Sequence, residues 1–287
     1  MMNVSEIIKS AYDKVSYATS IDSVIFLTGA LLFGIWLLKT SLGRKALSDS
    51  VPRRNNMPVY LPFVPLCIWA GIISLAGSIT EKFLPDLQDW QKALLDNIIL
   101  CTGAITATVV IIFIARAGFA RRLKGFGLNL RTIHKDFPAA LLNLFSVWPL
   151  IMATIILTIY LGKLIWGQDY EIQPHEELEL VMAYSQSSVR MLIIVTAVAI
   201  VPVFEEMLFR GLFQTMLRGV LLKPWLSITI VSGLFALAHA DAGHWPALFV
   251  LSMCMGYAYE KSGSLLRPIF IHSLFNATSI ILTLYSM

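Results

Sequence analysis

Long apolar runs separated by short polar segments make up most of this chain. A helix that crosses a membrane needs about 20 mainly apolar residues, because lipid leaves backbone groups no partner outside the helix itself. The pattern predicts spans near residues 22–38, 59–80, 93–115, 139–162, 189–217, 224–241, 245–259 and 268–286. We therefore expect an all-α, polytopic membrane helix bundle with about eight transmembrane helices.

Two of these predicted spans depart from a simple pattern. The fifth is longer than one crossing needs and contains Pro202, and a proline inside a helix removes a hydrogen bond and kinks the chain. The sixth and seventh are separated only by residues 241–244. Residues 1–20 mix charged and apolar positions and fit a short amphipathic lead-in rather than a cleavable signal peptide.

Composition agrees with a membrane protein. Hydrophobic residues make up 57% of the chain and charged residues 14%, whereas soluble domains carry about 25% charged residues. The three cysteines all lie in apolar stretches, which predicts no disulfide framework. The basic residues build no continuous face, so a nucleic-acid partner is not expected. The lipid bilayer is the expected environment, as for a multi-pass protein of a bacterial-type cytoplasmic membrane.

The basic residues gather in alternate connections between the predicted spans. They occur in segments 39–58, 116–138, 218–223 and 260–267, whereas the connection 163–188 is acidic. With eight spans, all four basic segments fall on one side, which the positive-inside rule assigns to the cytoplasm. Both termini then lie on the opposite side.

Charged residues inside the fifth span mark a candidate functional site. Glu205, Glu206 and Arg210 lie in an otherwise apolar stretch, and each costs about 2.5–3.5 kcal/mol at the bilayer centre on insertion scales. Glu206 and Arg210 are four residues apart and can pair on one helical face. Glu205 points about 100° away from Glu206. The alternative interpretation is that the three residues form a buried polar cluster with a structural role and no catalytic one.

Three further polar residues occur in the last predicted spans. His239 ends the sixth, and His272 and Asn276 lie four apart on one face of the eighth. A single histidine in a membrane helix often serves packing alone. With Glu205, however, this set supplies the base, proton carrier and oxyanion donors that hydrolysis of an acyl bond requires.

Distances counted along the predicted helices place the candidate site residues at different depths in the membrane. At about 1.5 Å per residue, Glu205 and His239 lie about 20 Å from Arg218 and Pro224, whereas His272 lies only about 7 Å from Arg267. Either the last helix begins deeper than predicted, or the fifth and sixth are tilted or broken.

The sequence resembles the CPBP family of intramembrane proteases, also called the ABI or CAAX protease family, which includes the type II CAAX prenyl endopeptidases and the lysostaphin-resistance-like proteins. Its three motifs appear in order as Glu205-Glu206-x-x-x-Arg210, Phe235-x-x-x-His239 and His272-x-x-x-Asn276. The resemblance covers about residues 189–285. It places the protease core in residues 139–287 and leaves residues 1–138 as three N-terminal membrane helices without a motif.

The resemblance implies an intramembrane endopeptidase. Glu205, helped by His239, would activate water. His272 and Asn276 would stabilise the oxyanion. Glu206 and Arg210 would support the site. The implied substrate is a membrane peptide or a lipidated protein, such as a prenylated CAAX-type peptide.

Whether the protein uses a metal cofactor is left open by the sequence. The name metalloprotease is often used for this family, and Glu205, His239 and His272 could bind Zn²⁺ or another divalent metal with water as the fourth ligand. A metal-free mechanism needs the same residues, and we favour no tightly bound metal.

A different class of function uses the same polar cluster. A non-catalytic membrane scaffold, or a transporter coupled to protons or ions, would also place such residues in the membrane. Two inverted halves with broken helices in matching positions would indicate a transporter. Here the intramembrane charges fall only in the second half of the chain.

Overall fold

The computed structural model describes residues 23–173, 176–184 and 186–285. The predicted amphipathic lead-in, residues 1–20, lies outside this part of the chain. A first helix, Ser23–Lys39, precedes the labelled elements. The helices that follow are α2 (Phe63–Phe83), α3 (Asp89–Gly118), α4 (Arg122–Phe126), α5 (Ile133–Trp166), α6 (Glu176–Ala183), α7 (Ser187–Val195), α8 (Val201–Glu206), α9 (Thr215–Leu221), α10 (Pro224–Leu237), α11 (Trp245–Ser262) and α12 (Leu266–Tyr285).

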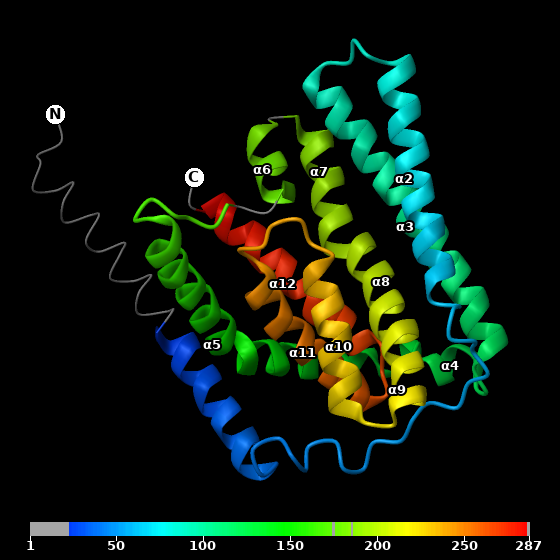
Figure 1. The fold of residues 1–287 in the computed structure, drawn as a ribbon, viewed down its shortest axis with the longest axis vertical. Helices are drawn as coiled ribbons and strands as arrows, with labels where there is room; N and C mark the ends of the chain where they lie inside the picture. The colour runs from blue at the N-terminus through cyan, green and yellow to red at the C-terminus, as the bar shows by residue number, and fades with distance from the viewer. Residues whose placement is uncertain (1–22, 174–175, 185, 286–287) are drawn as a thin grey trace, which may run out of the picture.

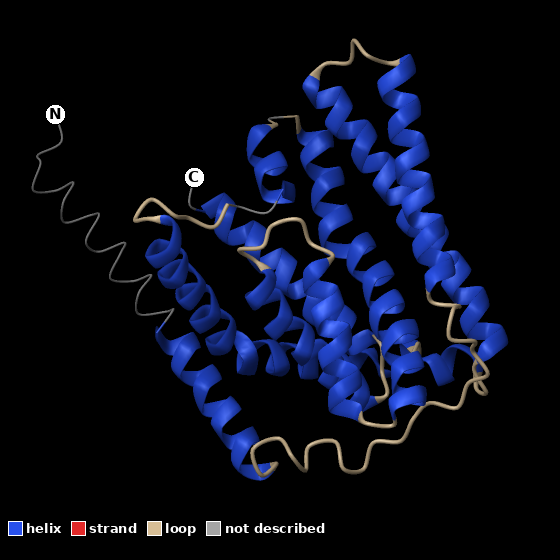
Figure 2. Ribbon diagram, in the orientation of Figure 1, coloured by secondary structure: helices blue, strands red, loops and turns tan. Residues whose placement is uncertain are grey.

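The prediction of an all-α membrane bundle is confirmed (Figure 2). Within the described residues, four helical segments are long and apolar enough to cross a membrane: Phe63–Phe83, Asp89–Gly118, Leu130–Trp166 and Ser187–Leu221. Three shorter apolar helices are Ser23–Lys39, Pro224–Leu237 and Leu266–Leu282. Helices thus occur where the eight spans were predicted, but the count of eight crossings stays a prediction, because α10 has only 14 residues.

The helices pack in three groups around the C-terminal half (Figure 1). The α2–α3 hairpin lies along one side of the long segment α7–α9, and α5 lies on the other side of the bundle. Helices α10, α11 and α12 fill the space between them. Among the described residues, three hydrophobic clusters hold this arrangement, and the two larger ones lie around Ile111 and Leu212 and around Ile151 and Met255.

The segment from α7 to α9 is one continuous helix with two wider π-helical stretches. These are Thr196–Ile200 and Met207–Gln214, and they flank α8, which carries Glu205 and Glu206. Pro202 is the second residue of α8, which follows the first stretch directly. Because proline has no N–H, the hydrogen-bonding register must change near it. π-helical stretches of this kind occur frequently at functional sites.

The start of α12 explains the disagreement in depth found in the sequence. Leu265 N–H donates to Gly127 O at 2.9 Å, and Ser264 Oγ donates to Asp136 Oδ2 at 2.6 Å. Arg267 pairs with the same carboxylate at 3.2 Å, and Asp136 is only 2% exposed. α12 therefore begins inside the protein, beneath the α4–α5 connection, and His272 reaches the level of Glu206 within two turns.

Removing the Asp136 carboxylate should destabilise the protein. In Asp136→Ala the junction loses its acceptor for Ser264 and Arg267, and breaking a buried ion pair costs about 3–5 kcal/mol. Because the Arg267 side chain is 23% exposed, water will offset part of this loss, and we expect about 2 kcal/mol. Thermal unfolding of purified protein measures the change. Asp86→Ala, in an exposed loop, is the control, and equal melting of the two variants would contradict the prediction.

Candidate active site

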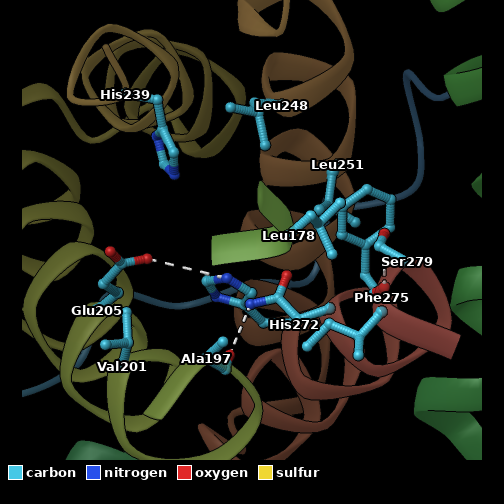
Figure 3. A pocket seen from close by; sticks show the side chains of 12 residues that line it. Leu178, Ala197, Val201, Glu205, His239, Leu248, Leu251, His272, Phe275 and Ser279 are labelled. Carbon is cyan, nitrogen blue, oxygen red and sulfur yellow. Dashed lines mark hydrogen bonds and ion pairs between the residues drawn. The ribbon is translucent and has the colours of Figure 1, made fainter. Parts of the chain in front are cut away.

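A small cavity inside the C-terminal half brings the predicted site residues together (Figure 3). Its volume is about 90 Å³, room for about three water molecules at about 30 Å³ each. Residues from α6, the α7–α8 segment, α11, α12 and the end of α10 line it. They are Leu178, Ala197, Val201, Glu205, His239, Leu248, Leu251, His272, Phe275, Asn276, Ser279 and Ile280.

The two adjacent glutamates occupy different environments. Glu206 is fully buried, and its Oε1 accepts hydrogen bonds from Arg210 Nη1 at 2.7 Å and from His272 Nδ1 at 3.0 Å. The side chain of Glu205 is 21% exposed and points into the cavity. One carboxylate is therefore fixed by protein groups, while its neighbour is open to water or to a substrate.

Arg210 is held from two further directions. Its Nη2 donates to Ser252 Oγ at 2.6 Å, and its guanidinium lies 4.7 Å from the centre of the Phe235 ring. These contacts fix the guanidinium, which in turn fixes Glu206. Ser252 on α11 carries no sequence signal, because a serine in an apolar helix is common and only the fold brings it to Arg210.

The hydrogen bond to Glu206 sets the protonation of His272. A carboxylate accepts and does not donate, so His272 Nδ1 carries a hydrogen. Its Nε2 faces Glu205 Oε2 at 3.8 Å, which is too long for a direct hydrogen bond, although a water or substrate oxygen to one side of the pair could contact both groups.

His239 is oriented through its backbone and its ring. Its Nδ1 lies 2.8 Å from Phe235 O, and because a carbonyl oxygen only accepts, Nδ1 carries the hydrogen. In the neutral ring the lone pair is then on Nε2. Trp245 Nε1 donates to His239 O at 2.8 Å. From the sequence Trp245 fits an interfacial anchor, whereas in the structure it fixes the histidine backbone.

Asn276 is tied to the first π-helical stretch. Its Nδ2 donates to Ala197 O at 2.8 Å. That carbonyl lacks a helical partner for a clear reason: Val201 N–H donates to Thr196 O, and the next residue, Pro202, has no N–H. Asn276 therefore satisfies a carbonyl that the proline leaves open. The amide has a second N–H, which can serve the cavity.

This contact predicts a coupling between Asn276 and Pro202. Asn276→Ala should destabilise the protein by about 1–3 kcal/mol, because Ala197 O is left buried without a donor. In a Pro202→Ala background residue 202 regains its N–H, so the same substitution should cost less. Unfolding of the four proteins in this double-mutant cycle measures the coupling.

The peptidase activity of the same four proteins separates two roles of Asn276. Activity that returns together with stability in the double variant would assign Asn276 a structural role alone. Activity that stays low would support a direct contact with the substrate. Strictly additive stabilities would contradict the predicted coupling.

Three of the residues that line the cavity are the candidate metal ligands Glu205, His239 and His272. Within the described ranges, no three His, Cys, Asp or Glu side chains are grouped as metal ligands. The contacts of His272 Nδ1 with Glu206 and of His239 Nδ1 with Phe235 O are of the kind that orients a histidine for binding through Nε2. The role of these three residues as metal ligands therefore stays a prediction.

Comparison with known proteins identifies the family. Residues 187–278 match the family model described as type II CAAX prenyl endopeptidase Rce1-like, and Glu205, His239, His272 and Asn276 all lie within the match. Comparisons with curated proteins and with solved structures give no match. The family and the long apolar helices indicate a multi-pass integral membrane protein. Over residues 187–278 the chain carries a domain of the Rce1-like type II CAAX prenyl endopeptidase (CPBP) family.

Proposed function

We propose that this protein is an intramembrane endopeptidase that hydrolyses a peptide bond of a membrane-associated substrate, in a bacterial-type cytoplasmic membrane. Family membership implies an intramembrane protease. The observation that carries the proposal is the position of the Glu205 carboxylate, which points into a water-sized cavity that His239 and His272 also line. A partly exposed carboxylate inside a bundle of apolar helices has little structural reason to be there.

The first step assigns Glu205 as general base. Water bound between the Glu205 carboxylate and His239 Nε2 loses a proton to Glu205 while its oxygen attacks the peptide carbonyl carbon. Positioned general bases contribute about 10²–10⁴-fold to such reactions. Because Glu206 is already held by Arg210 and His272, Glu205 is the carboxylate left to take this proton.

The second step concerns the charge on the carbonyl oxygen. His272 protonated at both nitrogens donates from Nδ1 to Glu206 and offers Nε2–H to the oxyanion, and the second N–H of Asn276 is the other candidate donor. The proton held by Glu205 then passes to the leaving nitrogen as the C–N bond breaks. The products are a free acid and a free amine.

The substrate we propose is a lipidated or otherwise membrane-bound peptide, with the prenylated CAAX-type peptide as the model from the family. The cavity walls are mainly apolar, with Val201, Leu248 and Leu251 among them. They suit an apolar side chain next to the scissile bond.

Peptide hydrolysis in heavy-oxygen water tests this proposal. Purified protein in detergent is incubated with a library of labelled, farnesylated and unmodified peptides in H₂¹⁸O. We expect cleaved products whose new carboxyl group contains ¹⁸O. Intact peptides throughout would overturn the proposal and favour the scaffold or transporter alternative.

Chelation gives a separate prediction in the same assay. Since the proposed steps need no metal and no three His, Cys, Asp or Glu side chains are grouped as metal ligands in the described part of the chain, we expect activity to survive treatment with EDTA or 1,10-phenanthroline followed by desalting. A matched zinc peptidase of the H-E-x-x-H type serves as the positive control for metal removal. Loss of activity that added Zn²⁺ restores would show that the donor set rearranges around a metal.

A further inference from the structure

The basic connections lie together at one end of the bundle, the end where α9 turns into α10 (Figure 1). Arg218 Nε donates to Glu260 Oε1 at 2.9 Å, and Arg218 Nη2 donates to Ser50 O at 3.0 Å. Arg53 lies 3.8 Å from the same Glu260 carboxylate. The 39–58, 218–223 and 260–267 connections are therefore bonded to one another. We call this the basic end.

The opposite end carries the acidic connections. Asp86, Asp169, Glu171, Glu179 and Asp241 are all exposed there. The connection after α5 is bonded to the one between α10 and α11, since His244 Nε2 lies 2.8 Å from Gln173 O. We call this the acidic end. Figure 1 shows it at the top, with α6 and the α10–α11 loop above the middle of the bundle.

The cavity borders the acidic end. Leu178 of α6, which belongs to the acidic connection, forms part of its wall. His239, which also lines the cavity, is followed directly by Ala240 and Asp241, both of which are exposed.

Towards the basic end the path from Glu205 is closed by buried side chains. Arg210, Leu212, Gln214 and Thr215 are each at most 2% exposed, and Arg218 is 5% exposed. Of the two ends of the bundle, the acidic end is therefore the one that these side chains do not close off from Glu205.

The distribution of Lys and Arg indicates which side of the membrane each end of the bundle faces. Short connections rich in Lys and Arg stay in the cytoplasm, and acidic residues contribute little to orientation. The Lys and Arg residues of segments 39–58, 116–138, 218–223 and 260–267 all belong to the basic end, so the basic end is cytoplasmic.

We propose that the cavity opens on the extracytoplasmic side and that the substrate presents its scissile bond there. Hydrolysis at this site rests on the proposed function, whereas the sidedness rests on the arrangement of charges and cavity. The substrate class is then a peptide segment held at the outer face of the membrane, after export or translocation. Of the two substrates named under the proposed function, this arrangement favours a membrane-bound peptide at the outer face over a prenylated C-terminus that stays in the cytoplasm.

Cysteine labelling tests the sidedness without any need for activity. Cys67, Cys101 and Cys254 are replaced by Ser or Ala, and single cysteines are introduced as Asp169→Cys at the acidic end, Lys124→Cys at the basic end and Ser279→Cys in the cavity wall. Spheroplasts and inverted vesicles are treated with a small membrane-impermeant methanethiosulfonate. We expect Asp169→Cys and Ser279→Cys to react in spheroplasts, and Lys124→Cys only in inverted vesicles. Reaction of Ser279→Cys from the inverted side alone would overturn the proposal.

A peptidase assay on the same membranes links sidedness to function. A peptide that is cleaved in detergent receives a sulfonated tag, which keeps it from crossing the membrane, and is added to spheroplasts or to inverted vesicles. We expect cleavage in spheroplasts and its loss in inverted vesicles, with Glu205→Gln membranes as the background. Cleavage in inverted vesicles alone would contradict an outward-facing site. If no peptide is cleaved even in detergent, the proposed function fails, while the labelling still decides the side from which the cavity is reached.

Discussion

Glu205→Gln is expected to lower peptide hydrolysis by about 10²–10⁴-fold, the range that a positioned general base contributes. Glutamine keeps the size and one oxygen of the side chain but cannot take a proton from water. The loss should appear in kcat, because the substituted side chain still fits the cavity and leaves its walls intact. Initial rates with the best peptide from the library measure the effect.

The control makes the same Glu-to-Gln substitution at a position far from the cavity. Glu81→Gln removes a carboxylate from the exposed end of α2 and should leave the rate unchanged. Both proteins should melt at temperatures close to that of the wild type, since Glu205 makes no direct ion pair shorter than the 3.8 Å contact with His272 within the described part of the chain. A Glu205→Gln enzyme with full activity would remove the basis of the proposed mechanism.

Arg210→Met is expected to give the largest loss of stability, about 3–5 kcal/mol, the usual cost of leaving a buried charge without its partner. Glu206 would keep only His272 as a donor in a site with no exposure. Ser252 Oγ would lose its guanidinium contact as well. Thermal and denaturant unfolding in detergent measure the change, and Arg131→Met, at an exposed position, is the control.

A double substitution separates the charge from the packing. Glu206→Gln combined with Arg210→Met leaves no uncompensated ion, so stability should recover in part. Hydrolysis should not recover, because His272 loses the carboxylate that orients its ring. If Arg210→Met were as stable as the control, the ion pair would have no structural role.

The sequence predicted those features that depend on local pattern. Apolar runs are sufficient to predict the helices, since the membrane imposes their length. The four-residue spacing of Glu206 and Arg210 placed both on one face, and the structure pairs them at 2.7 Å. Convergence of Glu205, His239, His272 and Asn276 on one cavity agrees with the interpretation of these residues, although their catalytic roles stay predictions.

Features that depend on distant contacts could not be predicted. Nothing in the pattern indicates that α12 begins inside the protein, because only the fold places Ser264 and Arg267 against Asp136 in the first turn of α5. Pro202 indicated a kink, but the open Ala197 carbonyl and its Asn276 donor follow only from the register of the π-helical stretch. The division at residues 138 and 139 also stays a prediction.

The shortness of α10 has a consequence for the surrounding lipid. Its 14 residues extend only about 21 Å, against a hydrocarbon thickness of about 30 Å. Next to this helix the acyl chains must compress or the headgroups must sink, and such mismatch has a modest energetic cost. Thin bilayers of short-chain phospholipid would relieve that deformation, and the hydration of the His239 end of α10 would then depend on which lipids surround the protein.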